Sequence, residues 1–132
     1  SYTTFAYENL QLSTTKFEEE LQVQVRVKNT GLLAGREIVQ LYLAAPGKTM
    51  VKPLRELKAF AKTPLLAVGE DVTLEFTLTR KDLASFDETQ SAWVVEAGTY
   101  QVEVGASCAD IRQEASFIAS AMIVEKVNRA LV

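Results

Sequence analysis

The stretch that decides the fold is Val23-Gln-Val-Arg-Val-Lys-Asn-Thr-Gly31, followed by Gly35-Arg-Glu-Ile-Val-Gln-Leu-Tyr-Leu43. In its first half the valines alternate with polar side chains, and this period of two predicts a half-buried β-strand. Asn29-Thr30-Gly31 tolerates turn geometry, so a second strand is predicted from about residue 37 to 44, as the other arm of a hairpin. Two adjacent strands cannot bury their shared apolar face alone, so we expect a second sheet to cover it.

The second arm is apolar on both faces. Val39, Leu41 and Leu43 form one face, while Ile38 and Tyr42 lie on the other. A strand with apolar side chains on both faces is often covered on both. We therefore expect a neighbour to pack on the outer face at Ile38 and Tyr42.

Length and composition indicate one ordinary globular domain. The chain has 132 residues, 48% of them hydrophobic and 23% charged. A net charge of -3 argues against a general nucleic-acid binder, which needs a basic excess, and no apolar run is long enough to cross a membrane. Cys108 is the only cysteine, so an intrachain disulfide is excluded and the cellular compartment stays open.

The segment before the hairpin changes its pattern part-way. Phe5 and Tyr7 fall on one face of a predicted first strand, whereas Leu10 and Leu12 fall on the other. Because side chains in a strand alternate strictly, this change of parity predicts a β-bulge or a switch between sheets near residues 8 and 9.

A basic loop follows the hairpin after Ala45-Pro46-Gly47. Glu56 is its single acid, against five basic residues: Lys48, Lys52, Arg55, Lys58 and Lys62. Leu54, Leu57 and Phe60 are expected to anchor a short strand in its later part.

The remaining chain alternates between short strands and turns. Strict alternation predicts a strand from Val72 to Leu78, and one helical turn capped at Thr79 is expected to pin Leu83 and Phe86. Further strands are predicted at residues 92–95, at 100–104 and at 113–120, the last with Phe117 facing inward. About seven short strands without long helices predict an all-β, immunoglobulin-like antiparallel β-sandwich.

Two features of this sandwich stay open. Tyr100 either bonds through its hydroxyl to the preceding connection, as a tyrosine in such sandwiches often does, or is a plain core aromatic. Met122 to Val132 carries apolar residues at helical spacing, so residues 121–132 are predicted to be a C-terminal extension, as a linker or short helix. The sandwich domain itself is predicted to span residues 1–120.

The sequence lacks the residues for most catalytic and metal sites. It has no histidine, which excludes histidine-assisted triads and imidazole ligands, and a single cysteine excludes a structural zinc site in the isolated chain. Gly47-Lys48-Thr49 is not a phosphate-binding loop, because Tyr42 occupies the position where that motif has its first glycine. No cofactor or metal is expected.

Paired carboxylates are the remaining catalytic candidates. Asp87 with Glu88, and Asp110 with Glu114, fall in predicted loops without an apolar pocket that would raise one pKa, so no catalytic role is expected. Trp93 could stack on a sugar ring, but its apolar neighbours predict burial in the sandwich or at an interface.

Several blocks of the chain, in this order, resemble the fibronectin type III-like domain of family 3 glycoside hydrolases. They are Ser1-Tyr-Thr-Thr-Phe5, Val27-Lys-Asn-Thr-Gly31, Gly35-Arg-Glu-Ile-Val-Gln-Leu-Tyr-Leu43, Pro53-Leu-Arg-Glu-Leu-Lys-Ala-Phe60 and Trp93-Val-Val-Glu-Ala-Gly-Thr-Tyr-Gln-Val-Glu-Val-Gly105. Together they cover about residues 1 to 120, and the resemblance implies a fibronectin type III-like sandwich.

The enzymes of that family, chiefly β-glucosidases and β-xylosidases, are retaining hydrolases. Their nucleophilic aspartate lies in a TIM-like barrel and their acid/base usually in a following α/β domain, so no catalytic residue carries over to this chain. The resemblance implies a non-catalytic accessory domain that packs on and stabilises the catalytic domains of the same polypeptide. The residues expected to dock are Ile38, Tyr42, Lys48, Lys52, Arg55 and Trp93.

Two other functions stay open at this point. One is a carbohydrate-binding module that holds a polysaccharide substrate, for which exposed aromatic side chains would be the sign. The other is an adhesion or protein-partner sandwich unrelated to hydrolases. Neither nucleic acid nor a membrane is an expected partner, and the compartment, cytoplasmic or secreted with a parent enzyme, is left open.

Overall fold

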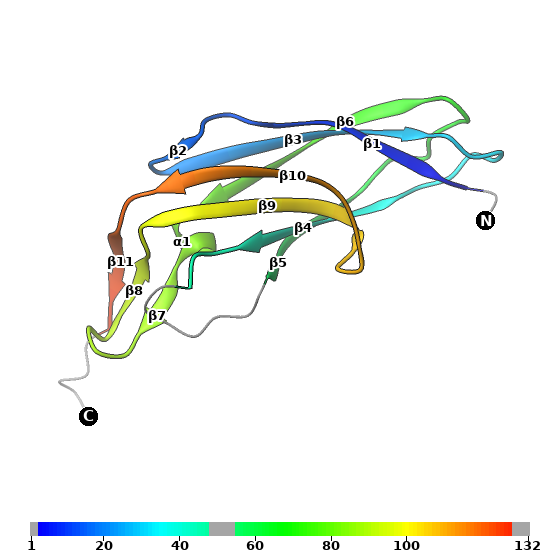
Figure 1. Ribbon diagram of the computed structural model, residues 1–132. Helices are drawn as coiled ribbons and strands as arrows, with labels where there is room; N and C mark the ends of the chain where they lie inside the picture. The colour runs from blue at the N-terminus through cyan, green and yellow to red at the C-terminus, as the bar shows by residue number, and fades with distance from the viewer. Residues whose placement is uncertain (1–2, 48–54, 128–132) are drawn as a thin grey trace.

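The computed structural model describes residues 3–47 and 55–127, which fold almost entirely into β-strands (Figure 1). The all-β prediction is confirmed. In chain order the elements are β1 (Phe5–Leu12), β2 (Lys16–Phe17), β3 (Glu20–Asn29), β4 (Ile38–Ala44), β5 (Glu56–Lys62), β6 (Asp71–Thr79), α1 (Arg80–Leu83), β7 (Ser85–Asp87), β8 (Ala92–Val95), β9 (Gly98–Ser107), β10 (Asp110–Ala119) and β11 (Met122–Lys126).

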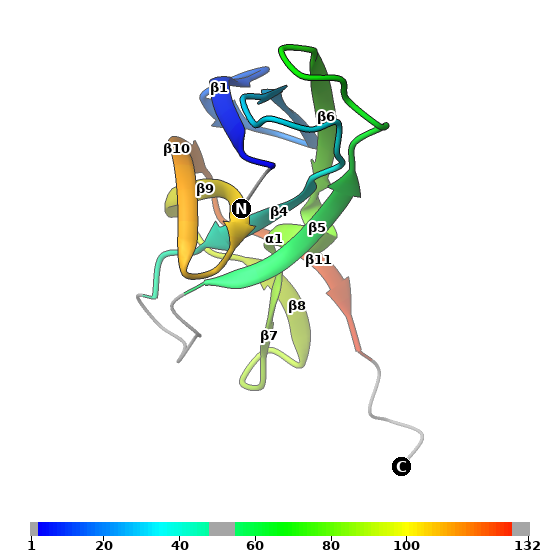
Figure 2. The ribbon, with the colours of Figure 1, turned by 90° about the vertical axis from the view of Figure 1, so that its right-hand side faces the viewer.

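The strands form a sandwich of two sheets with a third sheet at one end. The small sheet has the order β1-β3-β6, and the large sheet has the order β2-β10-β9-β4-β5. Figure 2 separates the two layers, with β1 and β6 above β10, β9, β4 and β5. The end sheet, in the order β11-β8-β7, extends away from the sandwich (Figure 1).

The core lies between the small and large sheets and follows the predicted alternation. Val23, Val25 and Val27 of β3 are fully buried, and the inward residues of β4 and β9 are buried as well. The ring of Tyr100 stacks on that of Phe117 with centroids 5.4 Å apart. Burial of each such side chain stabilises the fold by about 1.5–3 kcal/mol, so this alternation supplies most of the driving force for folding.

The predicted hairpin between the first two strong strands is wrong, although their faces are right. β3 pairs with β1 and β6 in the small sheet, whereas β4 pairs with β5 and β9 in the large sheet. The connection after Asn29 therefore crosses from one layer to the other. Alternation shows which side chains face a core but not which strands pair. Two strands in facing sheets show the same alternation as two strands that pair within one sheet.

The change of parity in the first strand is confirmed as a bulge. The pairing of β1 with β3 shifts register between Glu8 and Gln11, and Asn9 has a positive φ of 56°. Asparagine tolerates this left-handed conformation better than most residues. The chain then changes layer, because β2 pairs in parallel with β10 of the large sheet.

Tyr100 uses its hydroxyl as well as its ring. The hydroxyl donates a hydrogen bond of 2.8 Å to the carbonyl oxygen of Glu96, in the connection before β9. Of the two alternatives for Tyr100, the hydroxyl bond to the preceding connection is confirmed, and the ring is also part of the core.

The helical turn at Thr79 is confirmed as α1. Its start is fixed by the Asp82 carboxylate, whose Oδ2 accepts hydrogen bonds from the backbone nitrogen of Thr79 at 2.7 Å and from its hydroxyl at 3.1 Å. The turn ends at Leu83, which is buried in the core. The buried leucine holds the connection between β6 and β7 against the sandwich.

The short helix predicted after residue 121 is wrong over Met122–Lys126, which forms β11. This strand pairs antiparallel with β8, and Met122 and Val124 pack against the core. A helix of this length is marginal in water, whereas the edge of β8 offers backbone hydrogen bonds and suits the β-branched Ile123 and Val124. Residues 128–132 lie outside the described residues.

Candidate docking surface

The outer face of the large sheet exposes apolar side chains on two adjacent strands. Ile38 lies on the outer face of β4, and Leu57 and Phe60 lie on the same face of β5, where Phe60 is directly opposite Gln40. All three side chains are exposed, and Phe60 is exposed to 70%. We call Ile38, Leu57 and Phe60 the docking face.

The second predicted residue on this face, Tyr42, is already covered. Tyr42 lies opposite Leu57 and Glu103 and is only 8% exposed, and its hydroxyl donates to the side-chain oxygen of Gln40. Its position on the outer face is as predicted, but its neighbours in the same chain bury most of it.

Phe60 is expected in a short strand from the sequence, and the structure shows in addition that its side chain is exposed. Ala59 and Ala61 face the core, and this pair of small residues is the signal that Phe60 must point the other way. A large aromatic on the solvent side of a rigid sheet is the strongest apolar feature of the docking face.

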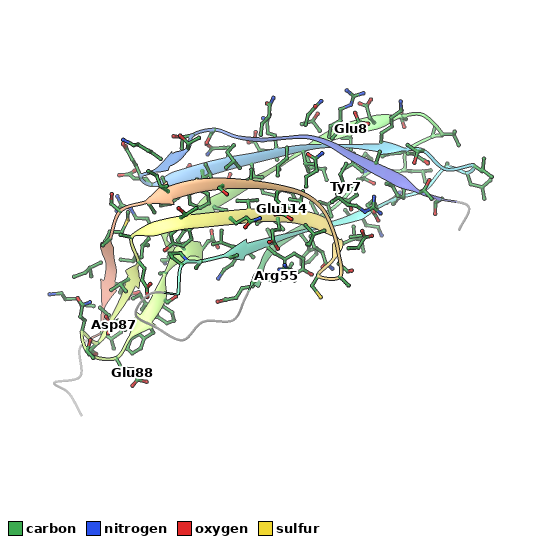
Figure 3. All side chains as sticks on the ribbon, viewed as in Figure 1. Tyr7, Glu8, Arg55, Asp87, Glu88 and Glu114 are labelled. Atoms are coloured by element: carbon green, nitrogen blue, oxygen red, sulfur yellow. The ribbon has the colours of Figure 1, made fainter. Side chains whose placement is uncertain are left out.

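An ion pair lies beside the docking face. Nε of Arg55 is 2.7 Å from Oε1 of Glu103 on β9, and its NH1 donates a hydrogen bond of 3.0 Å to the carbonyl oxygen of Cys108. The Glu103 side chain is buried, so the guanidinium supplies the opposite charge that a buried carboxylate requires. Figure 3 shows Arg55 below the strands of the large sheet.

Glu103 also has a like-charged neighbour on the next strand. Glu114 of β10 lies directly opposite it, and a pair of like charges at that position is destabilising. Gln101 donates a side-chain hydrogen bond to Glu114, while Arg55 pairs with Glu103. The two acids thus have separate polar partners.

The basic loop does not form a basic patch in the part of the chain that the structure describes. Arg55 is engaged with Glu103, and Nζ of Lys58 is 3.1 Å from Oε2 of Glu56. Lys48 and Lys52, which were predicted to dock, lie outside the described residues.

Trp93 is not buried in the sandwich, and the structure places it away from the docking face. It lies on β8 of the end sheet, is 42% exposed, and packs edge-on against Phe86 with ring centroids 5.4 Å apart. Beside it is a shallow pocket lined by Lys81, Ala84, Trp93, Val124 and Glu125. Trp93 and Ile38 therefore do not form one surface.

The first candidate pair of carboxylates lies in a turn where one of the two acids is held by hydrogen bonds. Asp87 and Glu88 lie at the tip that joins β7 to β8 (Figure 3). Hydrogen bonds from the side chains of Thr89 and Gln90 lower the pKa of Asp87. A general acid needs a raised pKa, so Asp87 instead serves as the acceptor that shapes this turn.

The second candidate pair is split between different partners. The hydrogen bond from Arg112 lowers the pKa of Asp110 at the start of β10. Glu114 lies farther along the same strand, on the outer face of the large sheet, where it accepts from Gln101. The two acids therefore have different hydrogen-bond partners.

The part of the chain that the structure describes lacks two kinds of feature. Residues 3–47 and 55–127 hold no group of three or more histidine, cysteine, aspartate or glutamate side chains arranged to bind a metal ion. The same residues contain no helix of the length and apolarity needed to cross a membrane.

Comparison with known proteins agrees with the β-sandwich fold. Residues 37–108, more than half of the chain, match the profile of the fibronectin type III-like domain. The chain belongs to the fibronectin type III-like domain family. This confirms the family resemblance drawn from the sequence blocks.

Relatives of this fibronectin type III-like domain include β-glucosidases. It is 40% identical over 119 residues to β-glucosidase BoGH3A of Bacteroides ovatus, covering 89% of this chain and 16% of that protein. It is 39% identical over 134 residues to a probable β-glucosidase L of Aspergillus fumigatus, covering 89% of this chain and 18% of the relative. The chain thus spans less than a fifth of the length of these relatives.

Solved structures show the same relationship. The fibronectin type III-like domain superimposes on β-glucosidase 3B from Thermotoga neapolitana, in complex with glucose, with a TM-score of 0.87 and 44% identity. The match covers 94% of this chain and 17% of that structure. A GH3 β-glucosidase from Bifidobacterium adolescentis matches with a TM-score of 0.85 and 34% identity.

Proposed function

We propose that this chain is a non-catalytic accessory domain of a family 3 glycoside hydrolase, a β-glucosidase, and that it packs on and stabilises the catalytic domains of the same polypeptide. The observation that carries the proposal is the docking face: three exposed apolar side chains on a rigid sheet, in a domain whose β-glucosidase relatives are more than five times longer. The hydrolytic reaction itself, with retention of configuration, belongs to those other domains.

Energetics favour such a contact. Covering Ile38, Leu57 and Phe60 would remove their apolar surface from water, and full burial of one large side chain is worth about 1.5–3 kcal/mol. Because both surfaces would belong to one polypeptide, docking avoids most of the translational entropy that separate molecules lose on binding. The edge position of β5 in the large sheet leaves Phe60 accessible to a neighbouring domain.

The chain itself supplies support rather than chemistry. The carboxylates of Asp87 and Asp110 are held in the charged form by their hydrogen bonds, and neither forms a proton-sharing pair with a second acid. We therefore assign no catalytic residue to this domain.

The test uses the full polypeptide that contains this chain. Deletion of the 132 residues should lower the melting temperature or the solubility of the catalytic part, and Phe60→Ser should reproduce part of that loss. Phe60→Ser should leave the isolated domain unchanged, because the side chain is mostly exposed there. An unchanged catalytic part after deletion would contradict the proposal.

Calorimetry distinguishes the stabilising role from direct binding of substrate. Titration of cello- or xylo-oligosaccharides into the isolated domain should give no saturable heat. Saturable binding that Trp93→Ala abolishes would assign the domain to polysaccharide binding instead, because Trp93 is the exposed aromatic beside the end-sheet pocket.

A further inference from the structure

Two loops at one end of the sandwich present a second exposed apolar surface. The connection from β3 to β4 carries Leu32 and Leu33, and the connection from β5 to β6 carries Leu65 and Val68. All four side chains are exposed, with Leu32 at 78%. Both connections lie at the same end of the molecule, opposite the end sheet (Figure 1). We call these four residues the apolar tip.

A buried asparagine holds the two loops together. Asn29 is fully buried, and its Nδ2 donates hydrogen bonds of 2.9 Å to the carbonyl oxygens of Leu33 in one loop and Leu66 in the other. Its Oδ1 accepts from the backbone nitrogen of Gly31 at 2.8 Å. One side chain thus fixes both loops, and each of its hydrogen-bonding atoms has a partner.

Backbone hydrogen bonds reinforce this clamp. The nitrogen of Gly35 donates to the carbonyl oxygen of Leu66 at 3.0 Å, and the nitrogen of Leu66 donates back to Gly35 at 2.8 Å. Leu66 itself is buried in the core, so the second loop is anchored between Leu65 and Val68. The apolar tip is therefore presented in a fixed geometry rather than on mobile loops.

The composition of the two loops indicates what kind of surface could cover them. The segments Thr30-Gly-Leu-Leu-Ala-Gly35 and Thr63-Pro-Leu-Leu-Ala-Val-Gly69, which carry the apolar tip, contain no charged residue, and the charged residues of the two connections, Arg36, Glu37 and Glu70, follow at their ends. An uncharged apolar surface lacks the donors and acceptors that fix a sugar and the cations that bind phosphate. It suits an apolar surface of a folded protein.

We propose that the apolar tip is a second docking surface of this domain and that the catalytic part of the same polypeptide covers it; this rests on the proposed function. The matched relatives supply the length for such a partner, because the domain spans only 16% and 18% of two of them. The start of β1 lies at this end, where the nitrogen of Thr30 donates to the carbonyl oxygen of Thr4 at 2.9 Å. Any chain that precedes β1 in a longer polypeptide therefore reaches the domain beside the apolar tip.

With the docking face on the large sheet, the tip would give the domain two separate contacts. Two separated contacts restrict the orientation of a domain more than one of them does. The apolar tip thereby sets how the sandwich sits on its partner.

The test compares three variants in the full polypeptide and in the isolated domain. Leu32→Ser combined with Val68→Ser removes half of the apolar tip, Phe60→Ser alters the docking face, and Ile123→Thr, which keeps a β-branched side chain in β11, is the control. Ile123 is also an exposed aliphatic residue, but it lies on β11 in the end sheet. The tip variant should lower the melting temperature of the full polypeptide by about 2 °C or more, while the control leaves it unchanged. In the isolated domain none of the three should lower it.

Each other result identifies which idea is wrong. If the tip variant has no effect on the full polypeptide while Phe60→Ser does, the inference about the tip is overturned and the proposed function stands. An equal loss in the isolated domain would show that the tip stabilises only its own fold, which overturns the inference. If sedimentation shows that the isolated domain dimerises and that the tip variant abolishes this without changing the full polypeptide, a second copy is the partner. If deletion of the whole domain also changes nothing, the proposed function fails.

Discussion

Nε of Arg55 lies 2.7 Å from Oε1 of Glu103, and this ion pair joins the segment before β5 to the outer face of β9. Arg55 is also hydrogen-bonded to the carbonyl oxygen of Cys108, in the turn between β9 and β10. One guanidinium therefore neutralises a buried acid and ties the edge of the large sheet to the β9–β10 hairpin. The docking face lies next to this ion pair.

Removal of the guanidinium should destabilise the domain. Arg55→Ala leaves the buried Glu103 without its cation, and we expect a loss of about 1–3 kcal/mol in the free energy of unfolding, measured by urea denaturation. Arg55→Ala combined with Glu103→Gln should recover part of the loss, because the unpaired charge is then gone. Equal or additive losses in the single and double variants would contradict the coupling.

Loss of the Asn29 side chain should open both loops of the apolar tip. Asn29→Ala removes three hydrogen bonds, although the carbonyl oxygen of Leu66 keeps the one from the nitrogen of Gly35, and we expect a cost of about 2 kcal/mol. Hydrogen exchange followed by mass spectrometry should become faster in residues 30–35 and 63–70. None of these hydrogen bonds involves β9. Exchange in β9 should therefore become faster only to the extent that the whole domain is destabilised. Slow exchange retained in both loops would show that backbone contacts alone hold the apolar tip.

The Tyr100 hydroxyl should make stability fall in alkaline solution. Burial, together with the negative charge of Glu96, raises the pKa of Tyr100 from 10.0 to about 12. Because the folded-state pKa lies above the unfolded one, the stabilisation is complete below pH 10 and is lost as the pH rises towards 12.

Tyr100→Phe separates this contribution from others. The variant lacks the hydrogen bond to Glu96, so at neutral pH it should be less stable by about 1 kcal/mol. Its stability should fall less steeply above pH 10 than that of the parent, although a slope will remain because burial also raises the pKa of Tyr7. Urea denaturation at a series of pH values measures both effects. Parallel curves for parent and variant would contradict this assignment.

Two glycines should respond differently to the same change. A Cβ at Gly105 would lie 2.0 Å from the carbonyl oxygen of Asp110, so Gly105→Ala must push the β9–β10 hairpin apart. A Cβ at Gly69 would meet no atom within 4 Å, and Gly69→Ala is strained only by its φ of +83°. We expect Gly69→Ala to cost about 1–2 kcal/mol and Gly105→Ala clearly more. Thermal denaturation of the two variants measures both losses of stability. A smaller loss for Gly105→Ala than for Gly69→Ala would contradict the close approach of Gly105 to Asp110.

The sequence predicted the inward faces well because burial imposes a strict period on each strand. Val23, Leu41 and Phe117 are all buried as expected, and the parity change after Tyr7 correctly marked a bulge. The same alternation carries no information about which strands pair. Pairing of β3 and β4 was therefore predicted wrongly, since a crossing between facing sheets leaves the same pattern.

The surface was harder to predict, because exposure depends on what lies beside a residue. Tyr42 is covered by residues that come from other strands. Phe60 lies between Ala59 and Ala61, which face the core, so its own side chain points to the opposite, exposed face of β5. β11 could not be recognised from its own residues, because it depends on the free edge of β8, which precedes it by a whole hairpin. Long-range partners decide each of these cases.

Hydroxyl-radical footprinting of the isolated domain and of the full polypeptide tests the central claim most directly, since it measures the solvent exposure of individual side chains. Phe60 and Leu57 should react in the isolated domain and become protected in the full polypeptide, while Ile123 on the end sheet should react equally in both. Reactivity of Phe60 and Leu57 that is the same in both samples would show that no other domain covers the docking face, and would contradict the account.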